Sequence, residues 1–274
     1  MMRVCSPTRN EFQRVMKLPL TLLFATFLQI ASVGYNLSFA QESQNLPVQS
    51  SSQSITLAAE DSWPPFANQF GQGISHRLIA AAFKQSQVEV NSLVVPYSRA
   101  LMMAEKGAVD GVFNVTREAS TEQRFVFGNT PLFVAKASFY QRKQRPLIAA
   151  NKWELPKGTV IGVIKSYEYG DEFPELVKKR QLNVVTVANQ QQLINLLMIG
   201  RIDAAVMFDL VAQENLQKMG VSDDVISAFN NHSSEIYLAF SKENPKAAQL
   251  AKELDQGLTQ LKANGQYQQL VSAK

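Results

Sequence analysis

One pattern occurs twice in this chain of 274 residues and limits its possible folds more than any other feature. A helical segment ends at a glycine, an aspartate follows three residues later, and an apolar strand ends in a polar residue nine residues after the glycine. Glycine suits the end of a helix because it adopts the left-handed conformation without a Cβ clash. The positions are Gly107, Asp110 and Thr116 in the first copy and Gly200, Asp203 and Asp209 in the second.

Two copies of this unit predict two similar α/β lobes, each with a polar residue at the tip of a buried strand. Open α/β sheets place their ligands at the carboxyl ends of strands, so Thr116 and Asp209 become candidate ligand contacts. The alternative is that such junctions are common to α/β proteins in general and carry no functional meaning. Asp110 and Asp203, at the strand starts, are expected to hold the preceding turns.

The N-terminal forty residues are typical of a secretory signal peptide. Basic residues precede an apolar run at 18–30, and small residues before Gln41 predict cleavage after Ala40. Met16 is an alternative start. A membrane anchor is the other interpretation, but the run is shorter than the roughly 20 apolar residues that a span needs. We therefore expect a secreted, periplasmic protein.

Composition excludes several classes of protein. The single cysteine, Cys5, lies in the expected leader, so the remaining chain has no disulfide or cysteine metal site. The leader holds four of the 27 basic residues and one of the 23 acidic ones, which leaves 23 basic against 22 acidic. Such a near-neutral chain gives no support to nucleic-acid binding. Residues 41–53, rich in Gln and Ser, are expected to be a disordered linker.

The rest of the chain alternates between predicted strands and helices. A first strand at 54–59 ends at Trp63-Pro64-Pro65-Phe66, because proline cannot donate to a strand ladder. Residues 117–124 are polar and expected to be irregular. Residues 132–140 form a long extended segment that could cross between lobes, and 236–240 a return strand. The last helix starts at Asn244-Pro245 and carries a leucine stripe for core packing at Leu250, Leu254, Leu258 and Leu261.

Several of these motifs together resemble the periplasmic amino-acid-binding proteins of ABC importers, the family 3 type of solute-binding protein. The motifs are Trp63-Pro64-Pro65-Phe66, the Gly-x-x-Asp units, Phe127-Gly128-Asn129-Thr130-Pro131 and Asn264-Gly265-Gln266-Tyr267-Gln268-Gln269-Leu270. The resemblance implies a two-lobed α/β fold of the periplasmic-binding-protein-like type II, each lobe a mixed sheet flanked by helices. Two hinge crossings are implied near 132–136 and 237–239.

The same resemblance implies a division of the chain. The expected segments are a signal peptide at 1–40, a disordered linker at 41–53, the first part of lobe 1 at 54–133, lobe 2 at 134–238 and the C-terminal part of lobe 1 at 239–274. It also implies a small-molecule ligand, an inner-membrane ABC permease as partner and a monomeric protein without cofactor or metal. The implied ligand contacts are Glu60, Trp63, Tyr97, Asn114, Thr116, Ser166, Tyr167, Glu168 and Asp209.

One position departs from the family pattern. Amino-acid binders of this family carry an arginine five residues after the strand-tip threonine, where it clamps the ligand carboxylate, but here that residue is Thr121. Arg99 and Arg117 are the alternative sources of such a clamp. Two of the expected ligand contacts have a purely structural alternative. Asp209 can be a helix N-cap, and Trp63 can pack on its proline turn.

The expected function is a periplasmic substrate-binding component that captures an amino acid, or a related carboxylate or zwitterion, by hinge closure. No nucleophile elbow, zincin or phosphate-loop motif is present, and His76 and His232 have no metal-ligand spacing. We therefore expect no enzyme. The alternatives are a cyclohexadienyl dehydratase-like enzyme of the same fold, with Glu60 or Glu168 as its acid, and a ligand-sensing module.

Overall fold

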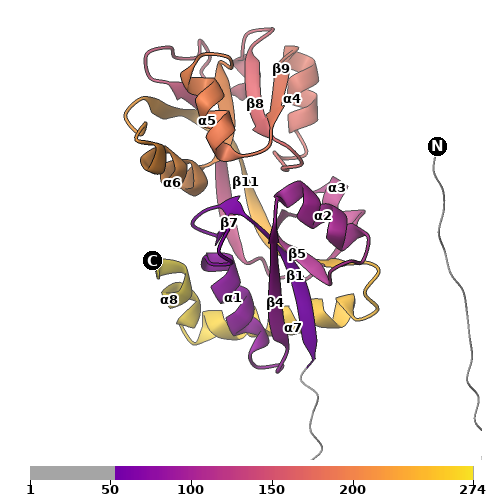
Figure 1. Ribbon diagram of the computed structural model, residues 1–274. Helices are drawn as coiled ribbons and strands as arrows, with labels where there is room; N and C mark the ends of the chain where they lie inside the picture. The colour runs from indigo at the N-terminus through magenta and orange to yellow at the C-terminus, as the bar shows by residue number, and fades with distance from the viewer. Residues whose placement is uncertain (1–52, 274) are drawn as a thin grey trace, which may run out of the picture. The chain divides into compact units, whose positions relative to one another are not determined.

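The structure, a computed structural model, describes residues 53–273. The expected signal peptide and all but the last residue of the expected linker lie outside the described residues. Within the described range, no helix is long and apolar enough to cross a membrane. These residues belong to one unit, in which strand pairing distinguishes two lobes (Figure 1).

A nine-stranded mixed sheet runs through the described residues in the order β4-β1-β5-β11-β7-β10-β8-β9, with β6 also paired to β11. Strands β2 and β3 form a separate small ribbon. The strands are β1 (Ser54–Glu60), β2 (Ser62–Trp63), β3 (Ala67–Asn68), β4 (Glu89–Val95), β5 (Gly111–Thr116), β6 (Phe125–Phe127), β7 (Phe133–Arg142), β8 (Val160–Ile164), β9 (Asn183–Val187), β10 (Ala204–Phe208) and β11 (Val225–Ser241).

Helices flank the strands of both lobes, as expected (Figure 1). In lobe 1 they accompany β1, β4 and β5, and in lobe 2 they accompany β8, β9 and β10. The helices are α1 (Ile74–Phe83), α2 (Tyr97–Glu105), α3 (Ala119–Glu122), the 3₁₀ turn η1 (Lys152–Glu154), α4 (Phe173–Arg180), α5 (Gln190–Met198), α6 (Asp209–Met219), α7 (Ala247–Ala263) and α8 (Gln266–Ser272).

Two long antiparallel strands, β7 and β11, join the lobes. The C-terminal part of β11, from Ile236, pairs with β5 and β6 of lobe 1, whereas residues 233–235 pair with β7 alone. From residue 137 on, β7 also pairs with β10 of lobe 2, so 233–235 is the stretch of β11 that lies between the two lobes' own strands. The expected hinge position near 237–239 stays a prediction. The prediction of a short return strand at 236–240 was wrong in extent. The polar segment before it continues β11, because its backbone pairs with β7.

The repeated unit is present in both lobes. Gly107 and Gly200 end their helices with φ values of 70° and 73°. In each copy the aspartate then binds the start of the neighbouring parallel strand. Asp110 Oδ2 accepts a hydrogen bond from the backbone N–H of Thr56 at 2.7 Å, and Asp203 Oδ2 accepts one from Val160 at 2.9 Å. These aspartates are structural, as expected, but the expected partner was wrong: their side chains bind the neighbouring strand and not the preceding turn.

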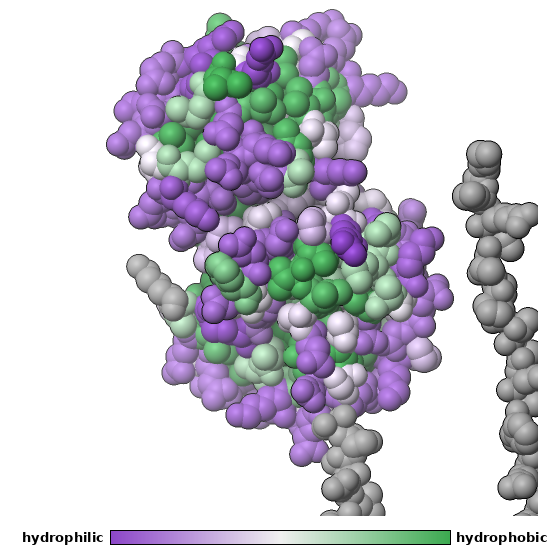
Figure 2. All heavy atoms as spheres, in the orientation of Figure 1, coloured by the Kyte–Doolittle hydropathy of each residue, from purple (hydrophilic) through white to green (hydrophobic). Residues whose placement is uncertain are grey.

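Helix α7 shows the expected stripe, with all four leucines buried. Each such leucine stabilises the fold by about 1.5–3 kcal/mol relative to an exposed position. Gly257 in the same helix lies against α1, where an added Cβ would be 2.1 Å from the carbonyl oxygen of Ala82. The irregular segment expected at 117–124 instead contains the short helix α3. The face seen in Figure 2 is mostly hydrophilic, with apolar atoms gathered near β4 and α2 and also on lobe 2. Leu93 of β4 and Met102 of α2 are exposed.

Candidate functional site

A small cavity brings residues of both lobes together. Its volume is about 10 Å³, which is room for about one water molecule. The strand tips of β1, β5 and β10, the start of α2 and the loop after β8 contribute its walls. The lining residues are Glu60, Trp63, Tyr97, Asn114, Thr116, Tyr167, Glu168 and Phe208. Seven of these eight are expected ligand contacts.

Two tyrosine–glutamate pairs cross from lobe to lobe. Tyr97, at the start of α2, donates its hydroxyl hydrogen to Glu168 Oε2 in lobe 2 at 2.8 Å. Tyr167 in lobe 2 donates in the same way to Glu60 Oε1 at the tip of β1. The Tyr97 and Tyr167 rings meet edge to face at a centroid distance of 5.2 Å. Each lobe therefore supplies one tyrosine and one glutamate, and the pairs hold the cavity closed.

The loop after β8 makes two more hydrogen bonds to lobe 1, one from its backbone and one through the Asp171 side chain. The N–H of Gly170 donates to Glu118 Oε1 at 2.8 Å, and the N–H of Ala119 donates to Asp171 Oδ1 at 3.4 Å. Gly170 and Asp171 lie a few residues after Tyr167 and Glu168 in the chain. The loop at 166–171 is consequently the part of lobe 2 that docks on lobe 1 through polar contacts.

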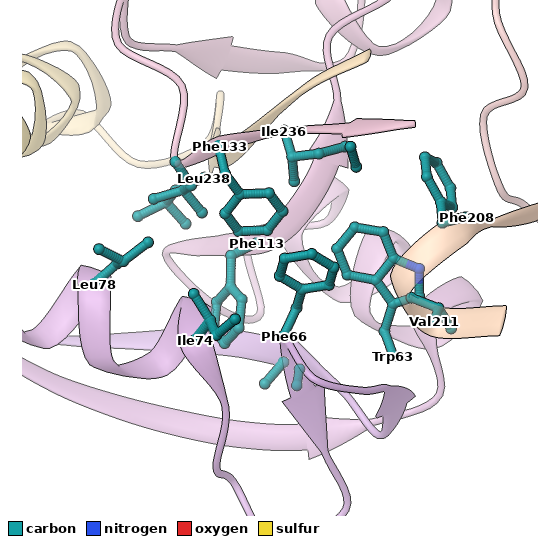
Figure 3. Packing of buried hydrophobic residues seen from close by; sticks show 14 of the residues in the cluster. Trp63, Phe66, Ile74, Leu78, Phe113, Phe133, Phe208, Val211, Ile236 and Leu238 are labelled. Atoms are coloured by element: carbon teal, nitrogen blue, oxygen red, sulfur yellow. The ribbon is translucent and has the colours of Figure 1, made fainter. Parts of the chain in front are cut away.

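Aromatic packing continues from the lobe 1 core to the cavity. Trp63 lies between Phe66 and Phe208, with ring centroid distances of 4.6 Å and 5.1 Å (Figure 3). Phe66 in turn stacks on Phe133 at the start of β7, at 4.2 Å. Trp63 is only 2% exposed and lines the cavity. That it meets a ligand stays a prediction.

Asn114 occupies a bulge in β5. The pairing of β5 with β11 shifts by one residue and skips Asn114, whose φ of 66° lies in the left-handed region. Such a conformation costs free energy in a residue other than glycine and is concentrated at functional sites. Its Oδ1 accepts a hydrogen bond from Ser75 Oγ at 2.5 Å. Among the described residues, its Nδ2 has no hydrogen-bond partner, and neither has Trp63 Nε1.

Burial changes the ionisation of both cavity acids. Desolvation raises the pKa of Glu60 to about 8, with smaller contributions from the charges of Asp61 and Glu168 and an opposing hydrogen bond from Tyr167. Desolvation likewise raises the pKa of Glu168 to about 8, opposed by its hydrogen bond from Tyr97. Both carboxyl groups are therefore mostly protonated at neutral pH, so the closed cavity is close to uncharged.

Four predicted contacts lie outside this cavity. Arg99 and Ser166 are exposed, and Ser166 has a φ of 66°. Arg117 Nε donates to Glu122 Oε1 at 2.6 Å, and its guanidinium lies over the rings of Phe127 and Tyr237.

Asp209 is the fourth of these residues. It opens α6 and accepts a hydrogen bond from Tyr140 at 3.0 Å, and its Oδ2 is 3.7 Å from Lys136 Nζ. The Asp209 side chain makes no N-cap hydrogen bond to α6, so the alternative role as a helix N-cap does not apply. That Asp209 meets a ligand stays a prediction.

Thr121 has a structural role in place of the family arginine. It is fully buried, and its Oγ1 donates to the carbonyl of Thr116 at 2.7 Å and accepts from the N–H of Glu118 at 3.0 Å. The second of these bonds belongs to the capping box of α3. A long cationic side chain has no space at this position, so neither Thr121 nor the two alternative arginines brings a positive charge to the cavity.

Phe208 is the cavity residue that the sequence did not indicate. It ends the buried strand β10, one residue before the predicted Asp209, and its ring faces Trp63 across the lobes (Figure 3). The available signal was its position at a strand tip, but an apolar residue there is ordinarily assigned to the core. In the part of the chain that the structure describes, no group of three or more His, Cys, Asp or Glu side chains is placed to hold a metal.

This architecture of two mixed α/β lobes joined by a pair of long strands is the periplasmic-binding-protein-like fold of type II. The chain belongs to the bacterial extracellular solute-binding proteins, family 3, whose sequence profile matches residues 55–273. No curated protein sequence matches it.

Solved structures share the fold at low sequence identity. An ancestral arginine-binding protein bound to arginine has a TM-score of 0.68 at 22% identity, over 79% of this chain and 96% of that one. A histidine kinase sensor domain similar to periplasmic binding proteins has a TM-score of 0.68 at 18% identity, over 79% and 93%. An ancestral amino-acid-binding protein, a precursor of cyclohexadienyl dehydratase, has a TM-score of 0.66 at 18% identity, over 79% and 92%.

Proposed function

We propose that this protein is a periplasmic receptor that captures a small polar solute between its lobes and presents it to an ABC permease of the inner membrane. The observation that carries the proposal is the cavity at the strand tips, which both lobes enclose with reciprocal tyrosine–glutamate hydrogen bonds. Family membership supports the same class of function. The expected cleavage of the leader would release the receptor into the periplasm as a monomer.

Capture requires the closed cavity to open. Ligand pockets measure about 300–1,000 Å³, far more than the 10 Å³ present here, so a solute must replace the contacts that now fill the site. Besides the tyrosine–glutamate bonds, the lobes meet through the loop at 166–171 and the Trp63–Phe208 contact. The chain itself passes between them through β7 and β11, the natural hinge. A ligand then favours reclosure to the extent that it binds the closed form more tightly than the open one.

A thermal unfolding screen tests solute capture. Purified protein is heated with amino acids, small amines and small carboxylates, each at about 100 times its Kd. Binding at that excess adds about 2.7 kcal/mol of stability. For a folded region of this size we expect the midpoint to rise by roughly 5–10 °C.

Matched tyrosine variants locate the binding event. Tyr97→Phe removes a hydroxyl that lines the cavity, and Tyr267→Phe removes one that donates to the carbonyl of Leu132 elsewhere in lobe 1. We expect the first variant to change ligand affinity severalfold and the second to leave it unchanged. A screen in which no compound raises the midpoint would refute solute capture.

An enzyme of the same fold is the second candidate, favoured by the two cavity carboxyl groups whose pKa is about 8. Such a group is a suitable general acid at neutral pH. The test is turnover of a hydroxylated cyclohexadiene acid, followed by the appearance of the aromatic product, with Glu168→Gln as the inactive control. A receptor binds such a compound stoichiometrically or not at all, and the uncharged cavity offers no counterion for the substrate carboxylate.

Sensing is the third candidate, and binding alone does not distinguish it from transport. A transport receptor is required for uptake, so deleting its gene abolishes accumulation of the labelled ligand by cells. A sensing module leaves uptake intact. We expect loss of uptake.

A further inference from the structure

The cavity walls offer acids, hydroxyls and aromatic rings but no base. Within residues 53–273, no lysine, arginine or histidine lines it. Two of the lining side chains, Glu60 and Glu168, are carboxyl groups, and four are aromatic. A carboxylate ligand would therefore be buried without a counterion, which is costly in a site closed to water. The walls instead offer two carboxyl groups that can ionise beside a cationic ligand.

Two donors in the same walls lack an acceptor. Trp63 and Asn114 are 2% and 5% exposed, and neither Trp63 Nε1 nor Asn114 Nδ2 has a hydrogen-bond partner among the described residues. Buried donors without partners are rare because each forfeits its hydration. Since both residues line the cavity, a ligand oxygen is the group that would satisfy them. The ligand thus needs an acceptor as well as a positive charge.

Building on the solute-capture function proposed above, we infer that the ligand is an aliphatic amine that carries an uncharged oxygen acceptor and no carboxylate. Its ammonium group pairs with Glu60 and Glu168, and its oxygen accepts from Trp63 and Asn114. The alkyl part lies among the rings of Tyr97, Tyr167 and Phe208, whose faces also attract a cation.

The two glutamates can supply the counterion at modest cost. With a pKa of about 8, loss of one proton at pH 7 reduces affinity by about tenfold, because one carboxyl in ten is already ionised. A charge-assisted hydrogen bond to the ammonium offsets that cost. The proton leaves to solvent, so binding of the amine releases about one proton per site.

Other charged and titratable groups face this pair from the elements around it. Tyr167, Asp61 and Glu168 act on Glu60, and Tyr97, Glu118 and Arg124 act on Glu168. The acids among them oppose ionisation, and Arg124 is the one cation named here that favours it. The tyrosines stay protonated over the working range, because burial raises the pKa of Tyr97 and Tyr167 well above the ordinary value.

Isothermal titration with three compounds of one chain length tests the inference on the purified protein. The compounds are 4-aminobutanol, with ammonium and hydroxyl; 4-aminobutyrate, with ammonium and carboxylate; and 4-hydroxybutyrate, with hydroxyl and carboxylate. We expect 4-aminobutanol to bind at least tenfold more tightly than the other two. Its affinity should rise about tenfold per pH unit between pH 6 and 7.5. Titration in two buffers of different ionisation enthalpy should give release of about one proton.

Variants identify the groups that lose the proton. Glu60→Gln and Glu168→Gln keep the volume of the side chain, and each should weaken 4-aminobutanol binding at least tenfold and reduce the released protons. Glu175→Gln, on the surface of α4, is the matched control and should bind as the wild type does.

Three outcomes distinguish the amine assignment from the broader proposal of solute capture. Tighter binding of the amino alcohol with proton release supports it. Preferred binding of 4-aminobutyrate, 4-hydroxybutyrate or a common amino acid overturns the amine assignment and leaves solute capture standing. Absence of binding by the three compounds and by the whole screening panel overturns both.

Discussion

At the scale of single residues, Thr121 shows how one side chain decides what a cavity can hold. In the resembling amino-acid binders this position carries an arginine that clamps a carboxylate. Here the threonine hydroxyl links the tip of β5 to the capping box of α3, and the side chain is fully buried. The absence of a cation at position 121 and the carboxyl groups in the cavity walls both favour a ligand without a carboxylate.

Restoring the arginine should therefore damage the fold and create no clamp. Thr121→Arg loses two hydrogen bonds of the α3 start and forces a charge into a packed site, so we expect a loss of about 2 kcal/mol or more. Urea unfolding followed by circular dichroism measures the change. Thr121→Ser keeps the hydroxyl and is the control, with an expected loss below about 1 kcal/mol. An arginine variant as stable as the serine one would disprove the structural role.

At the scale of elements, the repeated helix–glycine–strand unit builds each lobe in the same way. Its aspartate accepts a hydrogen bond from the first part of the adjacent parallel strand, β1 in lobe 1 and β8 in lobe 2. Asp110 also accepts from the Asn244 side chain before α7. The unit thus sets where two neighbouring strands begin relative to each other, and so where their polar tips meet at the cavity.

Removing either aspartate should weaken its own lobe. Asp110→Ala and Asp203→Ala each leave a strand N–H without its partner, so we expect each to cost about 1–3 kcal/mol. Chemical denaturation measures the loss, and hydrogen exchange at Thr56 or Val160 should speed up locally. Asp223→Ala, at an exposed position, is the control and should stay within about 0.5 kcal/mol of the wild type. Equal stability of all three variants would contradict the proposed role.

At the scale of the whole molecule, the two lobes meet through groups that titrate. Glu60 and Glu168 have a folded-state pKa of about 8, above the ordinary 4.5, so the folded protein binds more protons than the unfolded chain between these values. Their stabilising effect is complete below pH 4.5 and is lost as the pH rises to 8. Burial lowers the pKa of His76 and His232 to about 4, which has the opposite effect between pH 4 and 6.5.

Stability should therefore change little between pH 4.5 and 6.5 and fall between pH 6.5 and 8. In the first window two carboxyls and two histidines act in opposite directions. In the second only the carboxyls act, each contributing up to about 1.4 kcal/mol per pH unit. Urea unfolding across this range measures the slope. The Glu60→Gln, Glu168→Gln double variant should lose the fall, and a rise in wild-type stability above pH 6.5 would contradict the account.

The sequence by itself determined the local units of this protein. Glycines at helix ends, aspartates at strand starts and the leucine stripe of α7 depend on neighbours in the chain, and the motifs were specific enough to predict two α/β lobes. Seven cavity residues were among the ligand contacts that the family resemblance implied, and that they meet a ligand stays a prediction.

Only the tertiary structure decided the character of the site. The polar half of β11 forms a strand because β7 pairs with it, and Asn114 turns toward the cavity because a bulge against β11 displaces it. The reciprocal pairing of Tyr97 with Glu168 and Tyr167 with Glu60 joins residues 71 and 107 positions apart. Burial, and with it the protonation of the two acids, depends on what packs around a group from every side. No local pattern in a chain contains that information.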